Sequence, residues 1–144
     1  MSLITWDQDK FSVGIDEINE QHKKWITLIN RLHDSIMTHD SEISQEIAIR
    51  EMLDYTHFHF KQEEDLLRKV AYPDYEKHKL EHGHFILKLE KLDQDIANGN
   101  YVLRTQIMSI LKNWLENHIC KVDTLYGSFI SDNNRQQYAD DISH

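Results

Sequence analysis

The sequence contains little proline, glycine or cysteine for its length. Its 144 residues include one Pro, four Gly and one Cys. Because proline and glycine mark turns and loops, their scarcity argues against a β-rich chain or a chain with long linkers. The one cysteine, Cys120, excludes an intrachain disulfide and a cysteine-based metal cluster, and we expect it to be a buried structural thiol.

The sequence also lacks long apolar runs and an excess of basic residues. No stretch approaches the roughly 18–20 apolar residues of a membrane-spanning helix, and residues 1–16 lack the basic start and apolar core of a secretion signal. We therefore expect a cytoplasmic protein without a membrane partner. The formal net charge of −9 argues against a nucleic acid as partner, because nucleic-acid phosphates attract basic surfaces.

Apolar residues recur at alternating steps of three and four, the spacing of a helix face that is buried against other helices. The predicted helices run from about Asp16 to Thr38, from Ser41 to Val70, from Pro73 to the turn at Asn98, and from Leu103 to Phe129. Short turns between them predict an all-α, up-down-up-down antiparallel four-helix bundle. We expect one domain over residues 1–144, with an N-terminal arm (1–14), the bundle (15–131) and a polar C-terminal tail (132–144).

Histidines and acidic residues occupy several positions on these faces, where a bundle should have hydrophobic side chains. A buried polar group without a partner costs on the order of 1–3 kcal/mol, so a group of them must bond to something in the core. Seven residues have this placement, and they are His22, His59, Glu63, His78, His82, His118 and Asp123. Each predicted helix contributes at least one of them, which indicates a metal site inside the bundle.

The spacing of these residues suits ligation from the helices. His59 and Glu63 are four residues apart, and residues at i and i+4 share a helix face. His118 and Asp123 are five residues apart, and a regular α-helix would place them about 140° apart. If both are ligands, the last helix needs a π-type bulge, a distortion that is often found at functional sites.

The mixture of imidazole and carboxylate indicates which metals to expect. Imidazole suits iron, zinc, copper or nickel, and a carboxylate can join two cations. Two irons that share Glu63 and Asp123 are the economical arrangement, with an open position on one metal where a small gas would bind. These ligands do not distinguish iron from manganese. A closed structural zinc site needs fewer ligands, and the Glu-x-x-His pairs of ferritin-like oxidases are missing from the buried faces.

At these residues the sequence resembles the hemerythrin family, in particular its single-domain bacterial type. The resemblance is carried by GIDEINEQH (14–22), HFKQEE (59–64), YPDYEKHKLEH (72–82) and WLENHICKVD (114–123), which span all four predicted helices. It implies two irons with an oxo or hydroxo bridge between them. The implied ligands are His78, His82 and His118 on one iron, His22 and His59 on the other, and Glu63 and Asp123 across both.

The resemblance implies reversible dioxygen binding for storage, delivery or buffering, by a protein that is not an enzyme. Oxygen or redox sensing and a weak oxidase or peroxidase activity at the same centre are the alternatives. The pocket should be free of proton donors, because stray protonation would release peroxide and leave ferric iron. Four apolar residues beside the ligands fit that need: Phe60, Trp114, Leu115 and Ile119.

One residue departs from the family pattern. Family members often have leucine three residues after the first histidine, whereas this chain has Trp25. If Trp25 points at the open iron, we expect it to narrow the pocket or to slow oxygen exchange and autoxidation.

The remaining polar residues are expected to lie outside the ligand set. We expect five histidines at the surface, namely His33, His39, His57, His84 and His144. Glu64 is predicted to be a solvated charge or a partner of a ligand, and Tyr126 is a candidate hydrogen-bond donor near the site. The buried faces are all used within the bundle, which favours a monomer.

Overall fold

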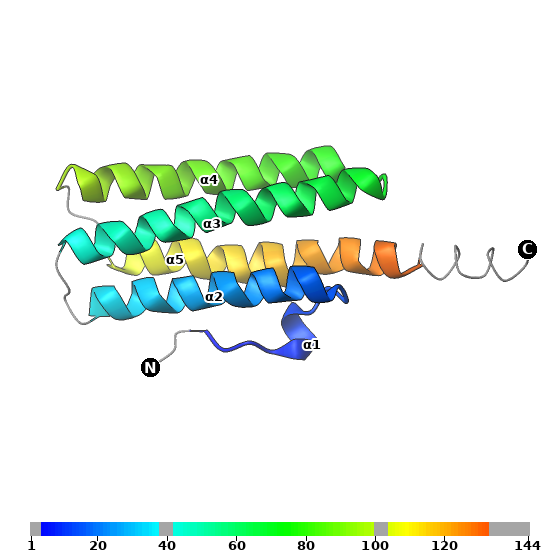
Figure 1. Ribbon diagram of the computed structural model, residues 1–144, viewed down its shortest axis with the longest axis horizontal. Coiled ribbons are helices and arrows are strands. Elements are labelled where there is room, and N and C mark those ends of the chain that lie inside the picture. Colours follow the sequence, from blue (N-terminus) through cyan, green and yellow to red (C-terminus); the bar gives the residue numbers. More distant parts are fainter. Residues whose placement is uncertain (1–3, 38–41, 100–103, 133–144) are drawn as a thin grey trace, which may run out of the picture.

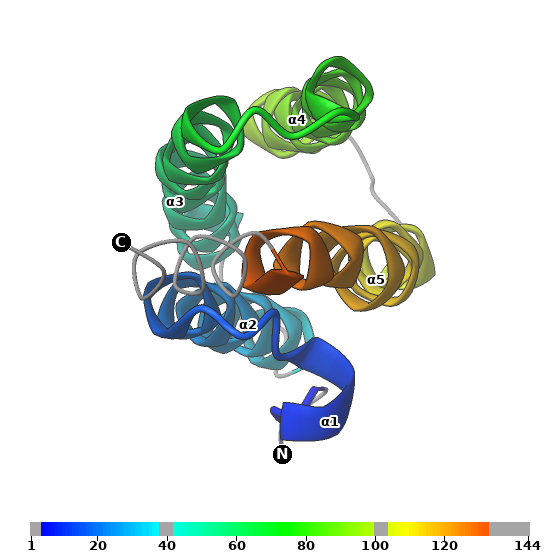
Figure 2. The same cartoon turned by 90° about the vertical axis from the view of Figure 1, so that its right-hand side faces the viewer.

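The predicted four-helix bundle is confirmed. The computed structural model describes residues 4–37, 42–99 and 104–132, and in these ranges it contains helices and no strand. Its elements are α1 (Gln8–Phe11), α2 (Asp16–Met37), α3 (Glu42–Lys69), α4 (Tyr75–Ala97), α5 (Arg104–Trp114) and the π-helix η1 (Leu115–Asp123), after which residues 124–132 are α-helical. The long helices alternate in direction (Figure 1), and seen end-on they follow one another around the bundle in chain order (Figure 2).

The helix boundaries agree with the sequence to within a few residues, and the start of the third helix is later than predicted. We predicted a start at Pro73, but α4 begins at Tyr75. The turn is longer because α3 ends with paired bonds from the amides of Ala71 and Tyr72 to the carbonyls of Arg68 and Leu67. This closure places Ala71 at a φ of 54°, and Pro73 then lies in the turn. The predicted start of the second helix, residue 41, lies outside the described residues.

Two apolar clusters fill the bundle, and a polar layer separates them. The larger cluster includes Trp25, Ile29, Leu32, Met52, Phe60, Phe85, Leu111, Leu115 and Ile119. The smaller cluster has Val13, Ile18, Leu67, Tyr126 and Ile130 as its buried members. On α2, His22 stands between Ile18 and Trp25, and the other helices repeat this order. Burial of the two clusters therefore holds the polar residues of different helices at one level.

The N-terminal arm is attached along α2. The side-chain amide of Asn30 accepts a bond from the Ile4 amide at 2.9 Å and donates one to the Ile4 carbonyl at 2.8 Å. Asn19 accepts a bond from the Val13 amide at 2.9 Å. Phe11 is buried in the larger cluster, and Trp6 packs against it. The arm therefore covers the bundle where α2 meets η1.

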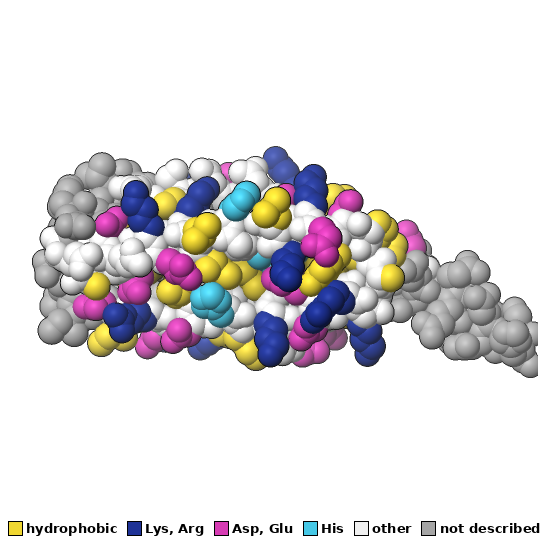
Figure 3. Space-filling model, turned by 90° about the horizontal axis from the view of Figure 1, so that it is seen from above, with side chains coloured by type: hydrophobic (Ala, Val, Ile, Leu, Met, Phe, Trp, Pro, Cys, Tyr) yellow, Lys and Arg dark blue, Asp and Glu magenta, His cyan; other side chains and the backbone are white. Residues whose placement is uncertain are grey.

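The surface carries charges of both signs. Acidic and basic side chains alternate over the face that includes α4 (Figure 3). Within the described ranges, none of the helices is long and apolar enough to cross a membrane.

Gly127 offers a test of how the arm packs against the last helix. A Cβ at this position would lie 2.3 Å from the carbonyl oxygen of Val13. We expect Gly127→Ala to lower the free energy of unfolding by about 1–3 kcal/mol, because the close contact forces the backbone apart. Urea denaturation followed by circular dichroism measures this.

Gly83→Ala is the matched control. Gly83 is an exposed residue of α4, and a Cβ there meets nothing within 4 Å. Alanine is the better helix former, so this variant should be more stable by up to about 1 kcal/mol. Equal stability of Gly127→Ala and the wild type would show that the arm does not pack as described.

Candidate metal centre

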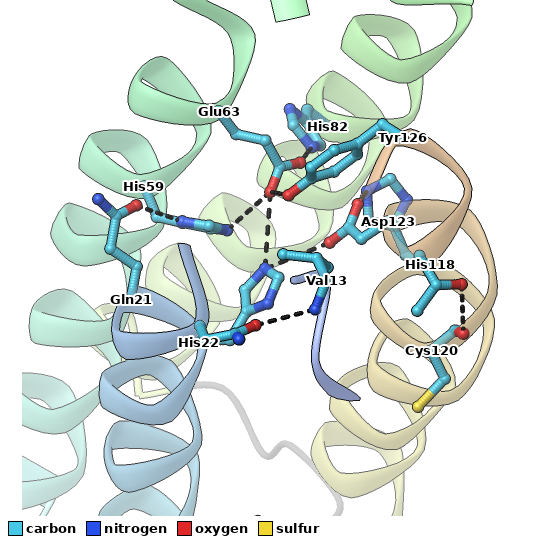
Figure 4. A network of polar contacts seen from close by, with 12 residues as sticks. Val13, Gln21, His22, His59, Glu63, His82, His118, Cys120, Asp123 and Tyr126 are labelled. Carbon is cyan, nitrogen blue, oxygen red and sulfur yellow. Dashed lines mark hydrogen bonds and ion pairs between the residues drawn. The ribbon is translucent and has the colours of Figure 1, made fainter. Parts of the chain in front are cut away.

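All seven residues predicted as ligands lie together in the polar layer. None of them is more than 3% exposed. They come from four elements, and Figure 4 shows His22, His59, Glu63 and Asp123 among those that point at one another. Their sources are His22 on α2, His59 and Glu63 on α3, His78 and His82 on α4, and His118 and Asp123 on η1.

The predicted distortion of the last helix is confirmed. Residues Leu115–Asp123 form a π-helix, in which residues five apart lie nearly above one another. His118 Nε2 consequently lies 3.0 Å from Asp123 Oδ1. A regular α-helix would direct one of these two side chains out of the layer.

Glu63 stands between two groups of histidines. Its Oε1 lies 2.6 Å from His78 Nε2 and 3.0 Å from His82 Nε2. Its Oε2 lies 3.2 Å from His59 Nε2 and 3.5 Å from His22 Nε2. Each oxygen of one carboxylate therefore faces a different group.

Asp123 divides its oxygens in the same way. Its Oδ1 lies 3.2 Å from His78 Nε2 and 3.0 Å from His118 Nε2, whereas its Oδ2 lies 3.3 Å from His22 Nε2. The donor atoms accordingly form two sets whose members lie within 4.8 Å of one another. One set contains Glu63, His78, His82, His118 and Asp123, and the other contains His22, His59 and Glu63.

The protein alone does not satisfy this cluster. Despite these short distances, no contact of either His22 ring nitrogen or of Asp123 Oδ1 has the geometry of a hydrogen bond among the described residues. The Nε2 atoms of His78 and His118 face each other at 3.2 Å. Buried polar atoms are normally hydrogen-bonded, and converging imidazole and carboxylate lone pairs suit a cation such as iron, manganese or zinc. The residues present therefore fit a metal-binding role.

Electrostatics in the layer couple the histidines to the carboxylates. Burial disfavours the charged imidazolium, but the nearby carboxylates of Asp123 and Glu63 outweigh burial and raise the pKa of His22 to about 9 and that of His78 to about 10. Burial also disfavours the charged form of Glu63, yet the surrounding imidazoles hold its pKa well below the ordinary value. Protons thus occupy sites that a metal would take, and metal binding must displace them.

Aromatic rings cover the three-histidine group on the side of the larger cluster. Phe60 stacks on His82 with ring centroids 3.7 Å apart, and Trp114 stacks on His118 at 3.9 Å. Leu115 and Ile119 are buried in the same cluster. The predicted apolar lining therefore lies directly beside the polar layer.

Trp25 belongs to the same cluster, one helical turn after His22. Its indole N–H donates to Thr56 Oγ1 at 3.2 Å, and its ring lies 5.9 Å from that of Phe85. Thr56 lies on α3 and Phe85 on α4, so these two contacts hold the indole in the larger apolar cluster, one turn of α2 from His22.

Three outer contacts of the histidines connect consecutive helices. They are Gln21 Oε1 with His59 Nδ1 at 2.7 Å, Glu64 Oε2 with His82 Nδ1 at 2.9 Å, and Glu81 Oε2 with His118 Nδ1 at 2.9 Å. The sequence allowed this role for Glu64 and did not assign it to Gln21 or Glu81. Each partner directly adjoins a ligand, and that adjacency was the available signal.

Tyr126 also contacts the centre. Its hydroxyl donates to Glu63 Oε2 at 3.0 Å from a fully buried position. The sequence had named it only as a candidate for such a bond.

The other histidines lie outside the cluster. His57 and His84 are exposed and His33 is half-buried, while His39 and His144 lie outside the described residues. Cys120 is half-buried rather than fully buried, and it packs against the larger cluster.

Comparisons with known proteins agree with the geometry. The family profile described as "Hemerythrin HHE cation binding domain" matches residues 13–130. The chain is 33% identical over 132 residues to a bacteriohemerythrin of Methylococcus capsulatus, covering 91% of this chain and 99% of that protein. It is 39% identical over 125 residues to a hemerythrin-like protein of Naegleria gruberi, covering 87% and 92%. A crystal structure of wild-type hemerythrin superposes with a TM-score of 0.82 at 31% identity, covering 88% of this chain and 96% of that one.

The raised pKa values predict proton release when metal binds. At pH 8 an imidazole with the ordinary pKa of 6.5 is neutral, whereas His22 and His78, with pKa values of about 9 and 10, are mostly protonated in the metal-free protein. We expect Zn²⁺ binding at pH 8 to release protons, measured by calorimetric titration in two buffers of different ionisation enthalpy.

Asp123→Asn should release fewer protons per bound metal, because it removes a carboxylate that raises both pKa values. His57→Gln, which changes an exposed histidine, is the control and should leave the number unchanged. Equal release from Asp123→Asn and the wild type would contradict the assigned coupling.

Proposed function

Because the chain belongs to the hemerythrin family, whose members have a non-haem di-iron centre, we propose that it binds dioxygen reversibly at two irons. The proposed ligands are His78, His82 and His118 for one iron, His22 and His59 for the other, and Glu63 and Asp123 for both, with an oxo or hydroxo bridge. One observation carries the proposal. Each buried carboxylate directs one oxygen to the three-histidine group and the other oxygen to the two-histidine group.

The unequal number of histidines indicates where dioxygen binds. The side with His22 and His59 has one imidazole fewer than the other side, which leaves room for a small ligand there. The chemistry expected of a bound iron pair is a reversible two-electron exchange with dioxygen. The residues of the chain have to hold the ligands still and keep water and protons away.

The apolar lining keeps water away from the ligands, and Tyr126 helps to hold Glu63 still. Phe60, Trp114, Leu115, Ile119 and Trp25 are the proposed pocket residues, and their packing excludes water on the side of the larger cluster.

The Tyr126 hydroxyl fixes the orientation of Glu63 through its hydrogen bond. Burial raises the pKa of Tyr126 well above its ordinary value, so this phenol holds its proton instead of donating it to bound oxygen.

A carrier is favoured over an enzyme by the surroundings of His59. Its outer nitrogen contacts the amide of Gln21, a group that does not deliver protons at neutral pH. Catalytic reduction of dioxygen requires repeated proton delivery, whereas reversible binding requires the opposite. Sensing and a weak oxidase or peroxidase activity are the alternatives to be tested, and the monomeric state and the cytoplasmic location stay predictions.

An optical spectrum tests the proposal. The protein is loaded with Fe(II) without air, exposed to dioxygen, and then returned to an oxygen-free atmosphere. Charge-transfer bands in the near-ultraviolet and visible range that appear with dioxygen and vanish on its removal would support reversible binding. Direct conversion to a ferric spectrum with release of peroxide would favour the oxidase or sensor alternative. A colourless protein after iron loading would refute the iron assignment.

Trp25 provides a prediction about the pocket. We expect Trp25→Leu to increase the rates of dioxygen dissociation and autoxidation several-fold, because the smaller side chain opens the packing next to His22. Stopped-flow absorbance measures the first rate, and the decay of the oxygenated spectrum measures the second.

Leu32→Ala is the control for a general loss of packing in the larger apolar cluster. Leu32 is fully buried in the same cluster, two further turns along α2. Its truncation should lower stability, by about 2–5 kcal/mol, with little effect on either rate. Unchanged rates in Trp25→Leu would remove Trp25 from the pocket.

A further inference from the structure

The outer nitrogens of the histidines have unequal hydrogen-bond partners. Those of His82 and His118 contact carboxylates, at 2.9 Å in both cases. That of His59 contacts an amide at 2.7 Å. Those of His22 and His78 have no hydrogen-bond partner in the described part of the chain. Both charged partners therefore belong to the three-histidine group, and the two-histidine group has a neutral one.

The two charged partners also contact solvent. The side chains of Glu64 and Glu81 are 19% and 32% exposed, whereas Gln21 is 7% exposed. Glu64 lines a groove of about 400 Å³ between α3 and α4, and Glu81 lines a groove of about 440 Å³ between α4 and the last helix. Contact with water lowers the desolvation cost of a carboxylate, so a negative charge is tolerated at these positions. A charge at position 21 would be buried.

The partner of the outer nitrogen affects how the inner nitrogen binds metal. A carboxylate that accepts the Nδ1–H fixes the tautomer with its lone pair on Nε2, orients the ring and makes Nε2 more basic. An amide oxygen has the same effect on the tautomer but carries no charge. The number of ligand atoms also favours tighter metal binding at the three-histidine position. Its set of converging ligand atoms comes from five residues, and the other set comes from three.

We propose that Glu64 and Glu81 are positioning residues that make the two metal positions unequal, so that the three-histidine position fills first and holds its metal more tightly. Gln21 leaves the two-histidine position the weaker one. The inference rests on the proposed di-metal centre and adds the order in which metal enters and leaves. A protein with one metal is then a defined state, and its empty position is the one proposed for dioxygen.

Titration of the metal-free protein with Co²⁺ under anaerobic conditions tests the order of filling. The visible bands of Co²⁺ report its coordination, and a competing chelator gives the affinities. We expect the wild type to bind two ions in two steps that differ at least tenfold in affinity. Binding of both ions in one step of equal affinity would overturn the proposal.

Variants of the partners identify the cause. Glu64→Gln and Glu81→Gln should each weaken the first step, by about 10–100-fold, and leave the second nearly unchanged. Gln21→Glu should strengthen the second step alone. Glu90→Gln is the control, because the ion-pair partner of this residue of α4 is the exposed His57, at 4.0 Å, which is not a proposed ligand, and neither step should move.

A structural role of the glutamates would give a different pattern. Glu81→Asp keeps the charge and should retain more of the first-step affinity than Glu81→Gln does. If the glutamine variants weakened both steps equally, the carboxylates would support the bundle and the proposal would fail. Far-UV circular dichroism of each metal-free variant identifies any that do not fold, and Gln21→Glu still tests the proposal in that case.

Failure of this inference is distinguishable from failure of the proposed function. A wild type that takes up Co²⁺ in two unequal steps but shows no reversible oxygen spectrum with iron would refute oxygen binding alone. Reversible oxygen binding together with two equal Co²⁺ steps would refute the unequal positions alone.

Discussion

The rest of the structure depends on the convergence of five imidazole nitrogens on two buried carboxylates. Burial of each charge costs several kcal/mol even after relaxation, so the cluster is acceptable only where the charges balance, through protons or through cations. This requirement fixes the level at which each helix contributes. A shift of one helix along its neighbours would place an imidazole in an apolar cluster and a hydrophobic side chain among the charges. The layer therefore sets the relative positions of the helices as well as the ligands.

The last helix meets this constraint by changing its winding. Because His118 and Asp123 both reach the layer, the chain between them must complete its turn with one residue more than an α-helix would use. The extra residue also rotates the part of the helix that follows, so that Tyr126 lies on the buried face and donates a hydrogen bond to Glu63. Gly127, the next residue, lies against the carbonyl of Val13. One local distortion thus positions two ligands, the support of a third, and the contact with the arm.

Much of this arrangement was predictable because its signals lie along the chain. The periodicity of the apolar residues predicted the four helices, and the polar residues on the apolar faces predicted the seven clustered side chains. The spacing of His118 and Asp123 gave the π-helix. The adjacency of Gln21 and Glu81 to ligands was visible in the sequence, but which histidine each of them contacts depends on the rotation of a neighbouring helix. The start of α4 at Tyr75 was missed because it depends on how α3 ends, with Ala71 in a conformation that alanine seldom adopts.

The outer contacts of the histidines follow a rule that depends on the three-dimensional arrangement of the helices. Adjacent residues on a helix point about 100° apart, so a residue next to a ligand faces the neighbouring helix. Gln21 on α2 supports a ligand on α3, Glu64 on α3 supports one on α4, and Glu81 on α4 supports one on η1. The series does not close, because His22 on α2 has no outer partner among the described residues. The open end lies on the side proposed for dioxygen. There, within the described ranges, the outer nitrogen of one of two histidines lacks a partner, against one of three on the other side, and a metal bound there would be freer to change its coordination.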